Sequence, residues 1–204
     1  MVKTMMIRNA NKNDIGSIID IHKNSFSSDH FSAAFNEELL TKYFKKLLSS
    51  NKYNYVFFDE SNSRLLGYVI AGYNYNLAVN KFIKENIKKL IWVLLKNPKF
   101  IIEKLNEIFR RLISLDNQPS VKCRLYLLAV DNQVKGKGVA KKLINHLEQE
   151  LIKDGQTVYG LSVRKENKEA INFYNKNGYI IEFEKSRSIY YYKKLIGFEN
   201  NSLI

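Results

Sequence analysis

Three segments in the second half of the chain restrict its fold more than any other feature. An apolar run occupies residues 121–130, an amphipathic helical pattern occupies 138–153, and a second strand-like run occupies 157–164. A strand, a helix and a strand in this order form a βαβ unit, whose two strands are parallel neighbours. We therefore expect a sheet with at least one parallel pair of strands.

The other strand-like segments predict antiparallel pairs on either side of this unit. Two pairs of aromatic or β-branched runs are each joined by a short polar connection, which is a hairpin signal. A mixed sheet of about seven strands flanked by helices follows, so we expect an α/β (α+β) fold. The expected strands are 4–9, 53–60, 64–73, 179–184 and 188–196, and the expected helices are about 11–26, 33–50 and 168–176.

The segment 76–118 departs from this alternation and is interpreted as an insertion. Two long helical patterns, 77–96 and 99–115, follow one another without a strand and are separated by an Asn-Pro pair. The segment contains nine basic and four acidic residues. Such helices either pack on their own domain and cover the ligand site, which is the commoner arrangement, or lie on a membrane or a partner. We expect a single domain, 1–204, that contains this helical insertion.

The net positive charge of the chain does not by itself identify its ligand. The 33 Lys and Arg outnumber the 20 Asp and Glu, which gives a formal net charge of +13. This charge fits a nucleic acid, an anionic membrane face or a phosphorylated small molecule. However, a chain rich in Lys, Asn and Ile, with only two Pro, can acquire the same charge from biased composition. Charge therefore does not decide among these ligands.

The sequence predicts a soluble, cytoplasmic protein. Cys123 is the only cysteine and lies in an apolar run, so we expect a buried side chain rather than a nucleophile. The first residues lack the apolar stretch of a signal peptide. No segment reaches the roughly 18 uncharged residues that a membrane span requires.

The turn inside the βαβ unit has the composition of an anion site. Gly136 and Gly138 precede the helix within the stretch QVKGKGVAKKL. The N–H groups of a helix's first turn lack intrahelical partners and bind phosphate oxygens, and glycine lets a phosphate approach the main chain. Such a turn is a weak signal by itself. The lysines that add positive charge here are Lys135, Lys137, Lys141 and Lys142.

Two motifs around this turn resemble those of a known family. The stretch LLAVDNQVKGKGVAKKLINHLEQEL, followed by LSVRKENKEAINFYNKNGYIIEFE, is similar to the GNAT superfamily of acetyl-CoA-dependent N-acetyltransferases. The family's coenzyme loop, R/Q-x-x-G-x-G/A, matches Lys135-x-x-Gly138-x-Ala140, with lysine as a departure at the first position. A second frame, Gln133-x-x-Gly136-x-Gly138, lies two residues nearer the strand. The family's helix motif, N-x-x-A-x-x-h-Y-x-x-x-G-F/Y, matches Asn167-x-x-Ala170-x-x-Phe173-Tyr174-x-x-x-Gly178-Tyr179.

The resemblance implies a GNAT-like fold with a V-shaped split between the strands at 121–130 and 157–164, where the pantetheine arm of acetyl-CoA lies. It implies that an acceptor amine attacks the thioester directly within a ternary complex. Tyr174 takes the position of the general acid, and the N–H of Val130 that of the oxyanion donor. No metal ion is expected. The residues assigned to acetyl-CoA are Leu128, Val130, Lys135, Gly136, Lys137, Gly138, Val139, Ala140, Asn167, Ala170 and Tyr174.

The base that would activate the acceptor is not evident from the sequence. Family members that acetylate lysine commonly use a glutamate on the fourth strand, and Arg124 stands at that position. A lysine amine is neutral in only about one molecule in 2500 at pH 7, so a less basic amine or deprotonation through water is favoured. Arg124 can instead bind an acidic acceptor group. Asp29 and His30 are the other candidates for contact with the acceptor, whereas His22, on an apolar helix face, is expected in the core.

These patterns favour an enzyme that acetylates a primary amine of a small molecule, such as an amino sugar or a nucleotide-linked sugar. Two alternatives remain open. One is acetylation of protein amino groups, and the other is a non-catalytic acyl-CoA-binding module that uses the basic insertion for contact. We expect acetyl-CoA and the amine as partners, and no nucleic acid. A peripheral membrane contact and a homodimer remain open.

Overall fold

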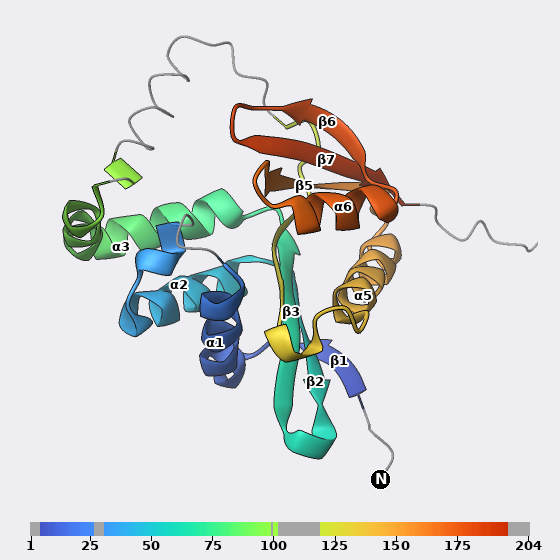
Figure 1. Ribbon diagram of the computed structural model, residues 1–204, viewed down its shortest axis with the longest axis horizontal. Helices are drawn as coiled ribbons and strands as arrows, with labels where there is room; N and C mark the ends of the chain where they lie inside the picture. The colour runs from blue at the N-terminus through green and yellow to red at the C-terminus, as the bar shows by residue number, and fades with distance from the viewer. Residues whose placement is uncertain (1–4, 27–30, 99, 102–118, 196–204) are drawn as a thin grey trace, which may run out of the picture.

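The computed structural model describes residues 5–26, 31–98, 100–101 and 119–195, and seven strands in this part of the chain form one sheet (Figure 1). The strand order is β1-β2-β3-β4-β5-β7-β6, and β4 and β5 are its parallel pair. The predicted α/β (α+β) class is confirmed. The strands are β1 (Met5–Asn9), β2 (Tyr53–Asp59), β3 (Arg64–Gly72), β4 (Arg124–Val130), β5 (Val158–Arg164), β6 (Ile180–Glu184) and β7 (Ser188–Lys194).

Helices cover both faces of the sheet. Figure 1 shows α1, α2 and α3 on one side of β3 and α5 on the other. The helix predicted at 77–96 is α3, whereas the one predicted at 99–115 lies mostly outside the described residues. The helices are α1 (Ile15–Ser25), α2 (Glu37–Ser50), α3 (Tyr75–Lys96), α5 (Val139–Lys153) and α6 (Lys168–Lys176).

Asparagine side chains set the beginnings of several helical segments. The Asn36 side chain accepts a hydrogen bond of 3.0 Å from the N–H of Leu39 at the start of α2. Asn167 accepts one of 3.0 Å from Ala170 at the start of α6. Because such a cap satisfies an otherwise free N–H, it defines where a helix begins. The predicted start of the second helix near residue 33 is therefore four residues early, and a short 3-10 turn, Phe31–Ala34, occupies that position.

The sheet separates two apolar cores. Strands β2 and β3 are buried along almost their whole length, as expected for strands covered on both faces. Leu143, Leu147 and Leu151 of α5 belong to one core, which also contains Cys123. The cysteine is 3% exposed, which confirms its predicted burial. The opposite core joins residues of α1, α2 and α3 to the other face of the sheet.

The two halves of the sheet run in different directions. In Figure 1 the strands β2 and β3 run vertically, whereas β5, β7 and β6 run across the view. Strands β4 and β5 form the joint between these halves. Among the described helices, none is both long and apolar enough to cross a membrane.

Candidate functional site

The pairing between β4 and β5 ends soon after it begins. Their register has two pairs, Arg124 with Gly160 and Leu125 with Leu161, although both strands continue for several residues beyond. The N–H of Gly160 donates to the carbonyl of Cys123 at 2.9 Å just before these pairs. A gap therefore opens toward the carboxyl ends of the two strands. The predicted split between them is confirmed.

A bulge in β4 determines which main-chain groups face this gap. On the β3 side, Ile70 pairs with Leu127 and Ala71 with Leu125, so Tyr126 is an extra residue in β4. Farther along, the N–H of Asp131 donates to the carbonyl of Leu66 in β3 at 2.9 Å. Because main-chain groups alternate in direction along a strand, those of Leu128 and Val130 point away from β3 and into the gap. These are the two residues that, by the family resemblance, are expected to face the pantetheine arm.

The C-terminal end of β4 is tied to α1 by a side chain that the sequence analysis did not single out. The hydroxyl of Ser25 donates to the carbonyl of Val130 at 3.1 Å. The Asn132 side chain donates to the carbonyl of Asn24 at 3.1 Å. Both bonds hold the open edge of β4 against the end of α1.

The loop after β4 is anchored by Arg64, at the start of β3. The guanidinium of Arg64 contacts the Asp131 carboxylate at 2.5 Å and the Gln133 side chain at 2.6 Å. The other Asp131 oxygen accepts from the N–H of Gln133 at 2.8 Å. Burial alone would raise the pKa of Asp131, but these hydrogen bonds and the arginine lower it. The first part of the loop is therefore held rigidly in place.

The second part of the loop leaves main-chain groups free. Gly136 and Gly138 have φ angles of 76° and 78°, in the left-handed region that favours glycine. A Cβ built at either position meets no heavy atom within 4 Å, so open space lies beside them. Among the described residues, none caps α5 with a side chain, and none accepts from the N–H groups of Gly138, Val139 or Ala140. These groups are suited to a diphosphate.

Lysines surround this helix start. Lys135, Lys137, Lys141 and Lys142 are all exposed. The ammonium of Lys135 lies 3.7 Å from the Glu169 carboxylate, so a weak ion pair joins the loop to the first turn of α6. Because both partners are largely exposed to water, this pair contributes little to stability. The positive charge is therefore available to an anionic ligand.

Tyr174, the predicted acid, lies on α6 with its ring in an aromatic group. Its ring centroid is 5.0 Å from that of Tyr179, and it is 8% exposed. Among the described residues, none forms a hydrogen bond with its hydroxyl. Burial raises the pKa of Tyr174 above its ordinary value of 10, so the phenol keeps its proton at neutral pH. The neighbouring Tyr159 differs, because its hydroxyl is bonded to both Glu148 and Tyr179.

Arg124 lies at the closed end of the gap. Its guanidinium is 3.2 Å from the carboxylate of Glu182 in β6, and a second nitrogen donates to the carbonyl of Leu161 in β5 at 2.5 Å. It also lies 5.4 Å from the centre of the Tyr190 ring. A Cβ at Gly160 would approach a guanidinium nitrogen to 2.8 Å, so the arginine crosses β5 where there is no side chain. A role of Arg124 in binding the acceptor stays a prediction.

The histidine predicted in the core and the two further acceptor candidates lie in different parts of the chain. His22 is 1% exposed, and its ring nitrogens lie 2.9 Å from the Tyr68 hydroxyl and 2.8 Å from that of Ser32. Its predicted place in the core is confirmed. Asp29 and His30 lie outside the described residues. Among the described residues there is no group of three His, Cys, Asp or Glu side chains placed to hold a metal ion.

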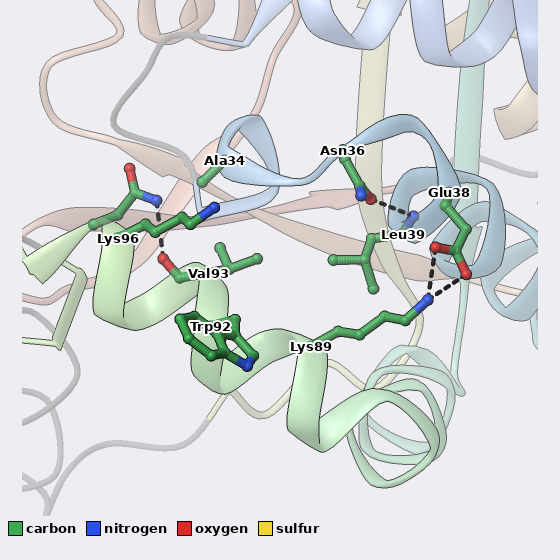
Figure 2. A pocket seen from close by; sticks show the side chains of 9 residues that line it. Ala34, Asn36, Glu38, Leu39, Lys89, Trp92, Val93 and Lys96 are labelled. Atoms are coloured by element: carbon green, nitrogen blue, oxygen red, sulfur yellow. Dashed lines mark hydrogen bonds and ion pairs between the residues drawn. The ribbon is translucent and has the colours of Figure 1, made fainter.

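A separate hollow of about 390 Å³ lies between α2 and α3 (Figure 2). Figure 2 shows Lys89 of α3 reaching across to Glu38 of α2, and Trp92 standing on the α3 side. The Glu38 carboxylate also pairs with Lys42, and hydrogen bonds from Lys42 and Lys89 lower its pKa to about 2. The hollow belongs to the helical layer and includes no residue of β4, β5 or α5.

Sequence reasoning missed the residues that support the site rather than form it. Arg64 lies 67 positions from Asp131, and Glu182 lies 58 positions from Arg124. Neither Arg64 nor Glu182 belongs to a motif. The signal that could have predicted Glu182 is the position of Arg124 inside the apolar run 121–130, because a charge drawn into a sheet requires an acidic partner.

A sequence profile of the acetyltransferase (GNAT) family matches residues 17–179 of this chain. A comparison with curated protein sequences found no match. Similar solved structures include PaiA N-acetyltransferase from Thermoplasma acidophilum in complex with coenzyme A. It is 15% identical, with a TM-score of 0.56, and the match covers 94% of this chain and 99% of that one.

Two further similar structures carry names that state different acceptors. The ribosomal-protein alanine N-acetyltransferase from Escherichia coli is 16% identical, with a TM-score of 0.52 over 98% of this chain and 99% of that one. A mutant agmatine N-acetyltransferase in its apo form is 15% identical, with a TM-score of 0.57 over 94% and 99%. At these identities the likeness shows the fold alone.

Proposed function

Because the chain belongs to the acetyltransferase (GNAT) family and is an N-acetyltransferase, we propose that it transfers an acetyl group from acetyl-CoA to a primary amine of a small molecule. The observation that carries this proposal is the open edge of β4, which leads through the loop 131–138 to a helix start without a side-chain cap. One end of this path suits a diphosphate and the other suits the amide groups of a pantetheine arm. An amino sugar or a nucleotide-linked sugar is the acceptor class that we favour.

Acetyl-CoA is proposed to bind along this path. The N–H groups of Gly138, Val139 and Ala140 receive the diphosphate, and the two left-handed glycines, Gly136 and Gly138, let it approach the main chain. Lys135 supplies a point charge rather than the planar fork of an arginine. The main chain of Leu128 pairs with the pantetheine amides, and the Val130 carbonyl accepts from them with the lone pair that Ser25 does not use. Lys137, Asn167 and Ala170 complete the set, and the Asn167 amide nitrogen remains free to donate because its oxygen caps α6.

Tyr174 is proposed as the general acid that protonates the leaving thiolate. One observation supports this role: its hydroxyl forms no hydrogen bond with any described residue and so is available to donate to the thiolate. The amine nitrogen bonds to the carbonyl carbon to give a tetrahedral oxyanion, which the N–H of Val130 stabilises. The carbon–sulfur bond then breaks and Tyr174 protonates the thiolate, the amine's proton leaves to water, and Tyr174 regains a proton from water. Arg124 cannot act as the base because guanidinium stays charged.

The acceptor class is tested with a panel of amines assayed for release of free thiol. The panel contains simple diamines, amino sugars, nucleotide-linked amino sugars, and peptides with free N-termini or lysines. Turnover that is highest with a small amine supports the proposal. Turnover that is highest with peptides favours acetylation of protein amino groups. Acetyl-CoA binding without turnover on any amine favours a non-catalytic module.

The acid is tested with Tyr174→Phe. Removal of a general acid is expected to lower kcat by about 10² to 10⁴-fold, with the KM for acetyl-CoA nearly unchanged. The matched control is Tyr159→Phe, because that hydroxyl lies in the same aromatic group but is bonded to Glu148. The control is expected to lose stability and keep its kcat. An unchanged kcat in Tyr174→Phe would exclude this tyrosine as the acid.

A further inference from the structure

Helix α3 has a second apolar face that is exposed. Its buried face consists of Ala78, Phe82, Asn86 and Leu90. Six of the eleven large apolar side chains that are exposed in the described part of the chain also belong to this helix. Single exposed apolar residues are ordinary, but a concentrated set marks an interaction surface. The six are Leu77, Ile83, Ile87, Ile91, Trp92 and Leu95.

The spacing of these residues places several of them in line. Ile87, Ile91 and Leu95 are four residues apart and follow a kink at Asn86, where φ is −124° and ψ is 19°. Residues spaced in this way lie one above another on a helix. Trp92 is 63% exposed and stands next to this line, at the rim of the hollow between α2 and α3 (Figure 2). The result is a convex apolar ridge.

The charges of α3 are distributed unequally between its two sides. On the side toward α2, Glu85 pairs with Lys46 at 2.7 Å, and Lys89 pairs with Glu38 at 2.5 Å. Lys84 and Lys88 each directly follow an exposed isoleucine, and neither has an ion pair with any described residue. Among the described residues, acidic side chains therefore neutralise only the side of α3 toward α2. Within this part of the chain, the positive charge of Lys84 and Lys88 beside the ridge is not neutralised.

We propose that this ridge, with Lys84 and Lys88 beside it, binds an anionic lipid surface. A helix with an apolar face and flanking lysines lies in the plane of a lipid interface, with its apolar side chains among the acyl chains. Tryptophan is favoured at that depth. A second copy of the chain fits less well, because a symmetric dimer through this ridge would bring the unpaired lysines of both copies together. The contact is independent of the proposed acetyl transfer.

Trp92 makes this proposal directly measurable, since it is the only tryptophan in the chain. Its emission, excited selectively over the tyrosines, reports on the ridge and on no other part of the protein. Vesicles of phosphatidylcholine with phosphatidylserine are expected to shift the emission to shorter wavelength and to carry the protein with them on flotation. Vesicles of phosphatidylcholine alone are expected to do neither. Added salt is expected to weaken the effect, because it screens the lysines.

Matched variants distinguish binding by the ridge from nonspecific binding by any exposed apolar residues. Ile87→Asn with Ile91→Asn is expected to abolish flotation. The control is Ile180→Asn with Ile181→Asn on β6, because these isoleucines are 50% and 48% exposed and the ridge pair are 49% each. Lys84→Gln with Lys88→Gln is expected to weaken vesicle binding by roughly 25-fold, about fivefold for each lysine. Lys122→Gln with Lys194→Gln, two exposed lysines elsewhere, is the control for charge and is expected to weaken binding much less.

Several outcomes would overturn the proposal. An emission shift that grows with protein concentration in the absence of vesicles would identify a second copy as the occupant. A shift on heparin that vesicles do not produce would identify a soluble polyanion. Equal shifts with neutral and anionic vesicles would remove the role of the lysines. No shift and no flotation with either vesicle would exclude lipid altogether.

Discussion

The closed and open ends of the gap between β4 and β5 differ in whether their polar groups have hydrogen-bond partners. At the closed end, the largely buried guanidinium of Arg124 contacts Glu182 and a main-chain carbonyl. Glu182 also accepts hydrogen bonds from the N–H and hydroxyl of Ser120 at 2.7 and 2.8 Å. At the open end, the first N–H groups of α5 have no partner among the described residues. The polar groups of the closed end are paired within the protein, and the N–H groups of the open end are suited to pairing with a ligand.

This difference assigns different energetic roles to the two ends. A buried charge without a partner is costly, so the closed end must be satisfied for the fold to be stable. Exposed N–H groups bind water without such a penalty, so the open end can exchange water for phosphate oxygens. Substitutions at the closed end should therefore reduce stability, and substitutions at the open end should reduce affinity for acetyl-CoA.

The largest effect is expected from Glu182→Ala at the closed end. This change leaves the largely buried charge of Arg124 with only main-chain carbonyls as hydrogen-bond partners and should lower the free energy of unfolding by about 2–3 kcal/mol. Denaturant unfolding measures it. The control is Glu184→Ala, two residues along the same strand, whose exposed pair with Lys165 should contribute no more than about 1 kcal/mol. Equal losses in both variants would show that the buried pair does not hold the joint.

The second effect is expected from Gly138→Ala at the open end. A residue with a Cβ disfavours the left-handed conformation by about 1–2 kcal/mol, which corresponds to a roughly 5- to 30-fold weaker Kd for acetyl-CoA if the free loop relaxes. Calorimetric titration measures this Kd. Gly155→Ala is the control, because Gly155 has a φ of 74° with open space beside it at the other end of α5. It should lose stability but keep the Kd. An unaltered Kd in Gly138→Ala would contradict the proposal that the open end binds acetyl-CoA.

A smaller effect is expected from Asn167→Ala, at the start of α6. Loss of a helix cap should lower stability by about 1 kcal/mol. The control is Asn36→Ala, because Asn36 caps α2 through a bond of the same 3.0 Å length. Thermal unfolding should show similar losses for both variants, whereas the Kd for acetyl-CoA should rise in Asn167→Ala alone. The same Kd for acetyl-CoA in both variants would show that Asn167 acts only as a helix cap.

The last prediction concerns the protonation of Glu182, which affects stability only in acid and not at neutral pH. Burial alone would raise its pKa, but the hydrogen bonds from Ser120 and the charge of Arg124 outweigh burial and lower the pKa below its ordinary 4.5. A carboxyl group with a lowered pKa stabilises the fold above the unfolded-state pKa, and this contribution is lost as pH falls through the folded-state value. The wild type should therefore lose more stability below pH 4.5 than Glu182→Gln does. Identical acid profiles for the two proteins would contradict this.

Sequence patterns anticipated the local parts of this arrangement well. The seven strands, the helix after the glycine turn and the motif that places Tyr174 on α6 all follow from spacing within short segments. The start of α2 was predicted too early, because apolar periodicity continues through a 3-10 turn and does not reveal that Asn36 is the cap. The roles assigned to individual residues of the site remain predictions.

The amino-acid sequence by itself determined the order of the elements, the position of the glycines beside α5 and the family to which the chain belongs, because each depends on neighbours along the chain. Only the tertiary structure decided that Arg124 is matched by Glu182, that Arg64 anchors the loop and that a ridge of α3 stays exposed. These facts depend on packing between distant segments. An amphipathic pattern shows that a helix has apolar residues, but only packing determines which of them another element covers.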